Sequence, residues 1–175
     1  MSEFQKQKAI KPKVEDKIIE LVNDDQKQAA LDFIGYIKAC KMTPAWATTN
    51  AWKYHYKGKR VGYFRISDSG GWLPQIHTQY DSHLRELIVN ESEAINAFVD
   101  KQIRGNVPCG GCMQGVDRRT VTKEFKNICS CTAISMENPD ENLCEFAKRL
   151  ITLRRDAIAN NRVPKCNYVK PADRT

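Results

Sequence analysis

The sequence lacks the signals of membrane insertion and of secretion. No apolar run approaches the ~18 residues that cross a bilayer. The first residues, MSEFQKQKAIKPK, contain no apolar core of a signal peptide. These absences predict a cytoplasmic protein that does not insert into a membrane. Thiols stay reduced in that compartment, and the odd count of 7 cysteines also argues against a complete disulfide framework.

The common enzyme fingerprints are absent as well. The chain has no Walker loop, no dinucleotide-binding glycine pattern, no nucleophile elbow and no HExxH zinc-protease motif. Its acidic residues are dispersed, and no pair of carboxylates stands out as a general acid and base. The sequence therefore favours a binding protein over an enzyme.

Basic residues outnumber acidic ones in this chain of 175 residues. Lys and Arg number 28 against 21 Asp and Glu, which gives a formal net charge of +7. This excess suits nucleic acid or another anionic partner, although solubility alone explains it equally well. The length fits one domain. We expect a single α+β domain over residues 13–160, with a flexible basic tail at 1–12 and a polar basic tail at 161–175.

Helical and strand-like patterns follow one another along the chain. Apolar residues recur at helical spacing over residues 13–41 and 90–103, and again after Asn138. Asn138 stands before Pro139 and predicts the N-cap of the last helix. Helices on either side of a group of strands predict the class α+β, with helices covering one face of an antiparallel sheet.

The strands are predicted in the middle third of the sequence. Trp52, Tyr54 and Tyr56 alternate with polar residues, as in a half-buried strand. Two glycine-containing turns then divide the region into an antiparallel meander of three to four strands. Pro74 predicts an edge position for the third strand, because proline cannot donate to the ladder.

Four of the cysteines lie in two tight pairs, Cys109 with Cys112 and Cys129 with Cys131, separated by sixteen residues. A C-x-x-C turn lets two sulfurs converge on one ion, and the two glycines between them let the backbone curl round it. The separation resembles that of ribbon-like four-cysteine zinc sites. We expect a small metal-binding loop over residues 107–131, holding Zn²⁺ or, as the alternative, an iron–sulfur cluster.

The cysteines also allow other assignments. Cys144 is the alternative fourth ligand if the C-x-C geometry of Cys131 is poor. Cys40 lies on a helical apolar stripe and is expected in the core, whereas Cys166 is expected as a free surface thiol. The Cys-Gly-Gly-Cys pair resembles a thioredoxin-type motif, but no apolar strand precedes Cys109 as that motif requires. Four unrelated thiols are the remaining alternative.

Seven aromatic residues crowd into residues 46–72. One interpretation is a sheet face packed under the helices. The other is a concave aromatic wall that binds a flat ligand or stacked bases. The candidate ligand-binding residues of that wall are Trp52, Tyr54, Tyr63 and Trp72. Its rim would carry the cations Lys53, Lys57, Lys59 and Arg60.

A second anion-binding candidate lies between the two cysteine pairs. Its cations are Arg118, Arg119, Lys123 and Lys126. Phosphate contacts by such residues release counterions and make binding salt-dependent. Arg154 and Arg155 of the last helix are expected to assist them.

Several segments together resemble a group of small, uncharacterised bacterial proteins. They are the C-x-x-C pair, KEFKNIC from Lys123, NPD from Asn138 and AKRLITLRRDAI from Ala147. The middle segments YKGKRVGYFRI and GWLPQI resemble the small α+β folds of the YdhG/YjbR type. The resemblance covers half to two-thirds of the chain. It implies an α+β fold and no particular activity.

Three hypotheses for function follow. The first is a zinc-binding α+β protein with a non-catalytic binding or regulatory role. The second is a thiol-dependent redox enzyme that uses the Cys109–Cys112 pair. The third is a nucleic-acid-binding zinc module.

Overall fold

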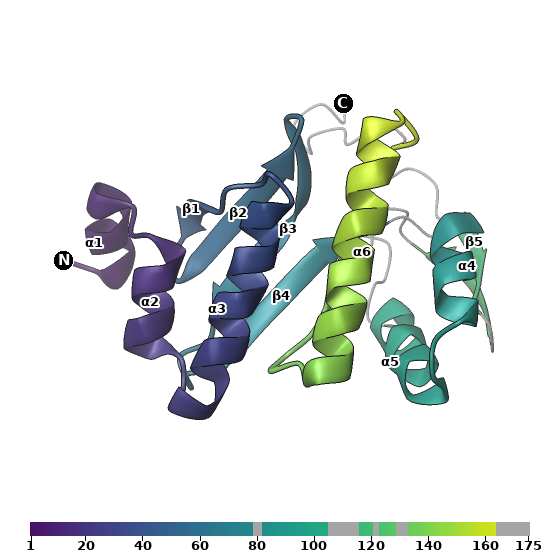
Figure 1. The fold of residues 1–175 in the computed structure, drawn as a ribbon, viewed down its shortest axis with the longest axis horizontal. Coiled ribbons are helices and arrows are strands. Elements are labelled where there is room, and N and C mark those ends of the chain that lie inside the picture. The colour runs from purple at the N-terminus through teal and green to yellow at the C-terminus, as the bar shows by residue number, and fades with distance from the viewer. Residues whose placement is uncertain (79–81, 105–115, 121–122, 129–132, 164–175) are drawn as a thin grey trace, which may run out of the picture.

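The computed structural model describes residues 1–78, 82–104, 116–120, 123–128 and 133–163. These residues form six helices and seven strands, which confirms the α+β class (Figure 1). The helices are α1 (Glu3–Ile10), α2 (Val14–Leu21), α3 (Asp24–Ala39), α4 (Ser82–Val89), α5 (Glu93–Arg104) and α6 (Glu141–Ala159). The strands are β1 (Ala45–Thr48), β2 (Ala51–Tyr56), β3 (Lys59–Ile66), β4 (Trp72–His77), β5 (Val116–Arg119), β6 (Glu124–Ile128) and β7 (Ala133–Ser135).

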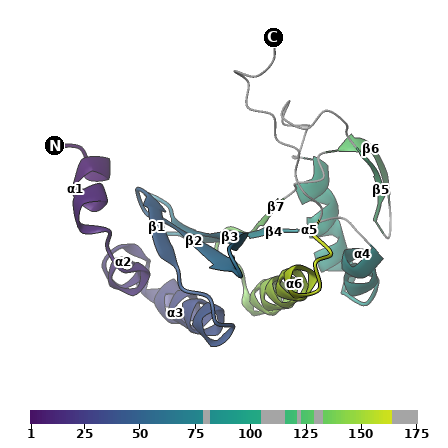
Figure 2. The same cartoon turned by 90° about the horizontal axis from the view of Figure 1, so that it is seen from above.

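Five strands form one antiparallel sheet in the order β1-β2-β3-β4-β7. The predicted meander is its centre, β2 to β4, and the short strands β1 and β7 extend it to five. A separate two-stranded sheet, β5-β6, is an antiparallel hairpin. Figure 2 shows α2, α3 and α6 on one side of the main sheet, with α4 and α5 beside its β7 end.

The core lies between the sheet and these helices. Alternate residues of β2, β3 and β4 point toward the helices, as the period of two in a strand requires. The ring of Trp72 packs 5.5 Å from that of Phe33 on α3 and 5.6 Å from that of Phe64 on β3. Full burial of one such aromatic side chain contributes about 2–3 kcal/mol. The helices and the sheet are thus held together by one apolar layer.

The predicted edge position of Pro74 is wrong, because β7 pairs with the outer side of β4. The Pro74 carbonyl accepts a hydrogen bond from the Met136 N–H, at 3.1 Å, just beyond the end of β7. In an antiparallel strand the nitrogen and carbonyl of one residue face the same neighbour. The N–H that proline lacks would therefore face the end of the three-residue strand β7. Only one hydrogen bond between β4 and β7 is lost.

The N-terminal residues are helical, whereas a flexible tail was predicted for 1–12. The Ser2 and Gln5 side chains form a capping box at the start of α1. Gln7 then docks the helix: its amide donates to Asn50 Oδ1 at 2.6 Å, and its oxygen accepts from the Asn50 N–H and the Trp46 indole. These partners are about forty residues away, so local sequence does not reveal them.

Helix α6 begins two residues later than predicted. Asp140 is its N-cap and accepts from the Leu143 N–H at 2.8 Å. Asn138 has a positive φ of 44° and accepts instead from the Trp72 N–H. Asn138 therefore connects the residues that precede α6 to β4 by a hydrogen bond. Of the predicted C-terminal tail, residues 164–175 lie outside the described part of the chain.

Candidate functional site

The face of β2, β3 and β4 that points away from α2, α3 and α6 is polar. No described helix covers it (Figure 2). Cross-strand pairing places Lys53, Tyr63 and Gln75 side by side across the three strands. The side chains of this face are Lys53, His55, Arg60, Tyr63, Arg65, Leu73, Gln75 and His77. Together with Lys57 of the β2–β3 turn and the adjoining Lys59 at the start of β3, we call them the basic sheet face.

The basic sheet face contains cations and no carboxylates. Residues 33–67 hold seven Lys and Arg and no Asp or Glu. Five of these cations belong to this face: Lys53, Lys57, Lys59, Arg60 and Arg65. Among the described residues none of the five forms an ion pair, whereas five cations of α2, α3 and α6 pair with Asp or Glu: Lys17, Lys27, Lys38, Lys148 and Arg149. The face therefore carries an uncompensated positive charge.

Tyr63 is the centre of this face. The guanidinium carbon of Arg60 lies 5.1 Å from the centroid of its ring, and that of Arg65 lies 5.4 Å from it. The His77 imidazole is 6.1 Å away, tilted by 49°. Cations within about 6 Å of an aromatic ring are attracted by its π-electrons. The ring thus holds two arginines close together without a counter-ion.

Both histidines of the face are held neutral by their surroundings. Burial, the positive charges of Arg60 and Arg154, and the neighbouring His55 together lower the pKa of His77 to about 4. Burial, Lys53 and Arg60 also lower the pKa of His55. At neutral pH the charge of the face therefore comes from Lys and Arg alone.

Three of the four predicted wall residues are core residues. Trp52, Tyr54 and Trp72 have 0% of their surface exposed. The Trp52 indole donates to the Pro12 carbonyl at 2.8 Å, and the Trp72 indole donates to Gln26 at 3.3 Å. These three match the interpretation of a sheet face packed under helices, and they offer no surface to a ligand in this conformation.

Tyr63 alone of the four lies on the polar side, half-buried and beside the predicted rim cations. The structure adds Arg65, which the sequence analysis did not single out. Its position two residues after Tyr63 was the available signal, because side chains two apart in a strand share a face.

The predicted metal ligands Cys109, Cys112, Cys129 and Cys131 lie outside the described residues, so the metal site stays a prediction. Within the described part of the chain, no group of three or more His, Cys, Asp or Glu is placed to hold a metal ion. Cys40 is buried in the core, as predicted. Cys144 is half-buried, its thiol donates to the Pro139 carbonyl at 3.5 Å, and burial raises its pKa.

The second anion-binding candidate falls on the separate hairpin. Arg118 and Arg119 are residues of β5, and Lys126 is a residue of β6. Lys123 precedes β6 and is exposed. Three of the four residues thus belong to the strands of a two-stranded sheet that is separate from the main sheet, and Lys123 belongs to its turn.

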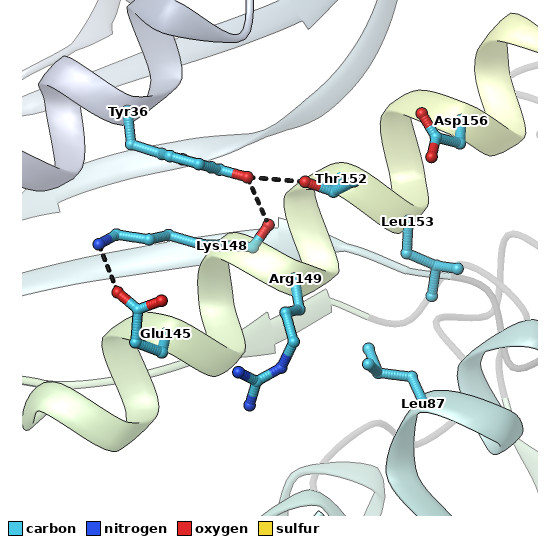
Figure 3. Close-up of a pocket in the computed structure, with 8 residues that line it drawn as sticks. All are labelled: Tyr36, Leu87, Glu145, Lys148, Arg149, Thr152, Leu153 and Asp156. Carbon is cyan, nitrogen blue, oxygen red and sulfur yellow. Dashed lines mark hydrogen bonds and ion pairs between the residues drawn. The ribbon is translucent and has the colours of Figure 1, made fainter. Parts of the chain in front are cut away.

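A groove of about 400 Å³ lies on the opposite, helical side of the molecule. The Tyr36 hydroxyl bonds there to Thr152 at 2.7 Å and to the Lys148 carbonyl (Figure 3). Its charged groups are already paired: Lys148 with Glu145, and Arg149 with Glu91 by two bonds of 2.9 and 2.8 Å. The remaining charged residue of the lining, Asp156, accepts a hydrogen bond from Arg155 at 3.5 Å, so the groove shows no unpaired charge among the described residues. Its lining residues are Tyr36, Leu87, Glu145, Lys148, Arg149, Thr152, Leu153 and Asp156.

Comparison of the chain with family models, curated proteins and solved structures finds no match. The resemblance to the small bacterial proteins therefore stays a prediction. None of the helices in the described ranges has both the length and the apolar character needed to span a membrane.

Proposed function

We propose that this protein is a non-catalytic binding protein for nucleic acid, which it holds on the basic sheet face. The observation that carries the proposal is the run of residues 33–67, which contains seven Lys and Arg and no Asp or Glu. Five of them share one face and its adjoining turn, and none is neutralised by an ion pair within the described residues. Like charges held this close repel one another, and a row of phosphates relieves that repulsion.

The electrostatic part of this proposal is tested by the salt dependence of binding. Each phosphate contact to a single strand contributes a slope of about −0.7 to log affinity against log salt, so five contacts predict roughly −3.5. Affinity for a labelled oligonucleotide should then fall about 100-fold between 50 and 200 mM salt, as measured by fluorescence anisotropy. No binding at 50 mM, or binding indifferent to salt, contradicts the proposal.

A pair of matched variants locates the binding face. Replacing Lys53 and Arg65 by Gln removes two charges from the basic sheet face and should reduce the slope by about 1.4. Replacing Lys27 and Lys38 by Gln removes two charges from α3 on the helical side, where each is paired with an acid. This control should leave the slope unchanged. Equal losses in both variants would mean that only net charge matters.

The cations of the β5–β6 hairpin are the alternative binding site for the nucleic acid. Replacing Arg118, Arg119 and Lys126 by Gln should reduce affinity little if the ligand lies on the basic sheet face. If this triple variant loses binding while the Lys53 and Arg65 variant keeps it, the ligand lies on β5 and β6 instead.

We also propose a structural zinc site next to the β5–β6 hairpin. Val116 and Ile128 are paired at its open end. Cys129 follows Ile128 directly, and Cys112 precedes Val116 by four residues. Both cysteine pairs therefore connect to the same end of the hairpin, which favours a single ion bound by all four thiolates. Such an ion contributes on the order of 10 kcal/mol to folding.

Elemental analysis tests the metal proposal. Protein purified without chelator should carry about one zinc per chain, and iron with visible absorbance would identify the cluster alternative. Less than about 0.2 zinc or iron per chain contradicts both forms of the proposal.

A thiol enzyme is the alternative use of Cys109 and Cys112. It requires a thiolate of low pKa, which reacts quickly with an alkylating reagent. Rapid alkylation of one of these two cysteines in native protein of low metal content would favour the enzyme. Slow alkylation of every cysteine in such protein would exclude it.

A further inference from the structure

Three planar side chains lie together on the basic sheet face. Arg60 and Arg65 lie over the ring of Tyr63, with guanidinium carbons 5.1 and 5.4 Å from its centroid. Both arginines are exposed and Tyr63 is half-buried, so the group is accessible from solvent. We call it the Arg-Tyr-Arg triad.

The triad exists because of a β-bulge. Arg60 and Tyr63 are three residues apart, and regular alternation would place them on opposite faces of β3. The register shifts between Tyr54 and His55, so that His55 pairs with Arg60 whereas Tyr54 pairs with Gly62. The extra residue brings Arg60 onto the face of Lys53 and Tyr63. Bulges that redirect a side chain in this way are frequent beside functional sites.

We propose that the nucleic acid held on the basic sheet face is single-stranded and that its unstacked bases stack on the Arg-Tyr-Arg triad. This inference rests on the proposed function. Bases of a single strand stack on aromatic rings and on guanidinium planes, and the triad offers both. Lys53 and Gln75 are the cross-strand neighbours of Tyr63. Lys53 supplies a phosphate contact, and the amide oxygen of Gln75 can accept from a base edge while its Nε2 donates to Ser135 at 3.1 Å.

A duplex fits this surface less well. The faces of its bases are hidden within its own stack, so a duplex can offer the triad only phosphates and groove edges. An open sheet face with a half-buried tyrosine beside exposed arginines instead presents planar groups on which unpaired bases can stack. A single strand can therefore bind this face through base stacking in addition to charge, whereas a duplex binds through its phosphates and groove edges.

An acidic protein is the competing occupant of a basic surface. Protein interfaces depend on apolar or aromatic anchors that fill pockets. In the described part of the chain, the exposed large apolar side chains lie at the N-terminus and on helices α1, α2 and α4, away from the basic sheet face. They are Met1, Phe4, Ile10, Ile19 and Val89. This distribution favours stacking over a protein contact.

The inference is tested with three single variants and two forms of one labelled oligonucleotide, single strand and duplex. Tyr63→Leu removes the aromatic ring and keeps apolar bulk, and should weaken single-strand binding about 10-fold or more while changing duplex binding less than about 3-fold. Tyr63→Phe keeps the ring and should bind as the original protein does. Arg65→Lys keeps the charge and removes the plane, so it should weaken single-strand binding at an unchanged salt slope. Circular dichroism confirms that each variant is folded.

The possible failures are distinguishable. Equal affinity for single strand and duplex, together with no effect of Tyr63→Leu, would overturn the stacking inference and leave salt-dependent binding in place. Displacement of the labelled strand by polyglutamate as readily as by unlabelled strand would also overturn it, because bases would then contribute nothing. Absence of salt-dependent binding to either form would overturn the proposed function itself.

Discussion

At Gly62 the sheet has no room for a side chain. A Cβ atom added there would lie 2.7 Å from the Cζ atom of Tyr54 and still closer to the carbonyl oxygen of Gln75. Tyr54 is fully buried, and burial raises the pKa of its hydroxyl group. The glycine therefore makes the space that the tyrosine fills, directly beneath the bulge that redirects Arg60.

Replacing Gly62 by Ala should lower the free energy of unfolding by about 2 kcal/mol or more, because backbone and a buried ring must both move. Urea unfolding followed by circular dichroism measures this. Gly35 on α3 is the matched control, since a Cβ there meets nothing within 4 Å. Gly35→Ala should raise stability by about 0.5–1 kcal/mol through helix propensity. Similar stabilities of the two variants would contradict the packing at Gly62.

His77 makes stability depend on pH. Its pKa is lowered to about 4 by burial and by the charges of Arg60 and Arg154, with His55 beside them. An unfolded chain has a histidine pKa near 6.5, so it binds the proton more readily than the folded protein does below that pH. Acidification therefore favours unfolding, and the stability present above about pH 6.5 is lost as the pH falls toward 4.

Between pH 7 and pH 5 this single group should reduce the free energy of unfolding by up to about 2 kcal/mol. The His77→Asn variant should show a correspondingly smaller loss over the same range, measured by urea unfolding at each pH. Greater stability of the original protein at pH 5 than at pH 7 would contradict the predicted direction of the pH dependence.

Among the elements, α1 depends most on one side chain. Gln7 is 1% exposed and connects the helix to β1 and to the β1–β2 turn through Trp46 and Asn50. Phe4 adds a ring contact of 5.8 Å with Trp46. Without Gln7, the Trp46 indole and the Asn50 N–H would lose their acceptor.

Gln7→Ala should lower the free energy of unfolding by about 1–3 kcal/mol, because it leaves buried polar groups without partners. Hydrogen exchange should also become faster for the amides of α1 than for those of α3. Gln28→Ala is the control, since this exposed glutamine on α3 bonds only to Asp32 in the described structure. Equal stability of both variants would show that Gln7 does not dock the helix.

The sequence predicted the elements whose patterns are long, and missed those fixed by distant contacts. Helices α2, α3, α5 and α6 and the central strands carry a periodic apolar side that marks them. Strands β1 and β7 have 4 and 3 residues, too few for a period to appear. Helix α4 went unpredicted, although its apolar residues do follow a helical period. The site was predicted only in part: Tyr63 and Arg60 were named in advance, whereas Arg65 was missed. The bulge that brings Arg60 beside Tyr63 follows from no residue pattern.

On the scale of the whole molecule, the two sides of the main sheet differ in character. The helical side is apolar and holds the core, and several of its surface cations, among them Lys17, Lys27 and Lys148, are paired with acids. The opposite side is polar, basic and free of carboxylates over β2, β3 and β4. The β5–β6 hairpin is a third part, and its cohesion is proposed to come from a metal ion.

The cysteines provide the test of that third part. Cys131→Ser should lose the zinc, because a neutral hydroxyl does not replace a thiolate in a closed tetrahedral shell. Cys144→Ser should keep it, since that thiol already donates to the Pro139 carbonyl. Cys40→Ser should also keep it and cost about 1–3 kcal/mol by burying a hydroxyl. The reverse result at Cys131 and Cys144, measured as zinc per chain, would assign the fourth ligand to α6.

The most direct test of the account is to map a bound oligonucleotide onto the chain by NMR. Amide and side-chain shifts on titration with a short single strand should be largest for residues of the basic sheet face, with Tyr63, Arg60 and Arg65 at the centre. The chemical shifts of the amides of α2, α3 and α6, which lie on the opposite side of the sheet, should change little. Shifts centred on β5 and β6, or on the groove around Tyr36, would contradict the assignment of the basic sheet face as the binding surface.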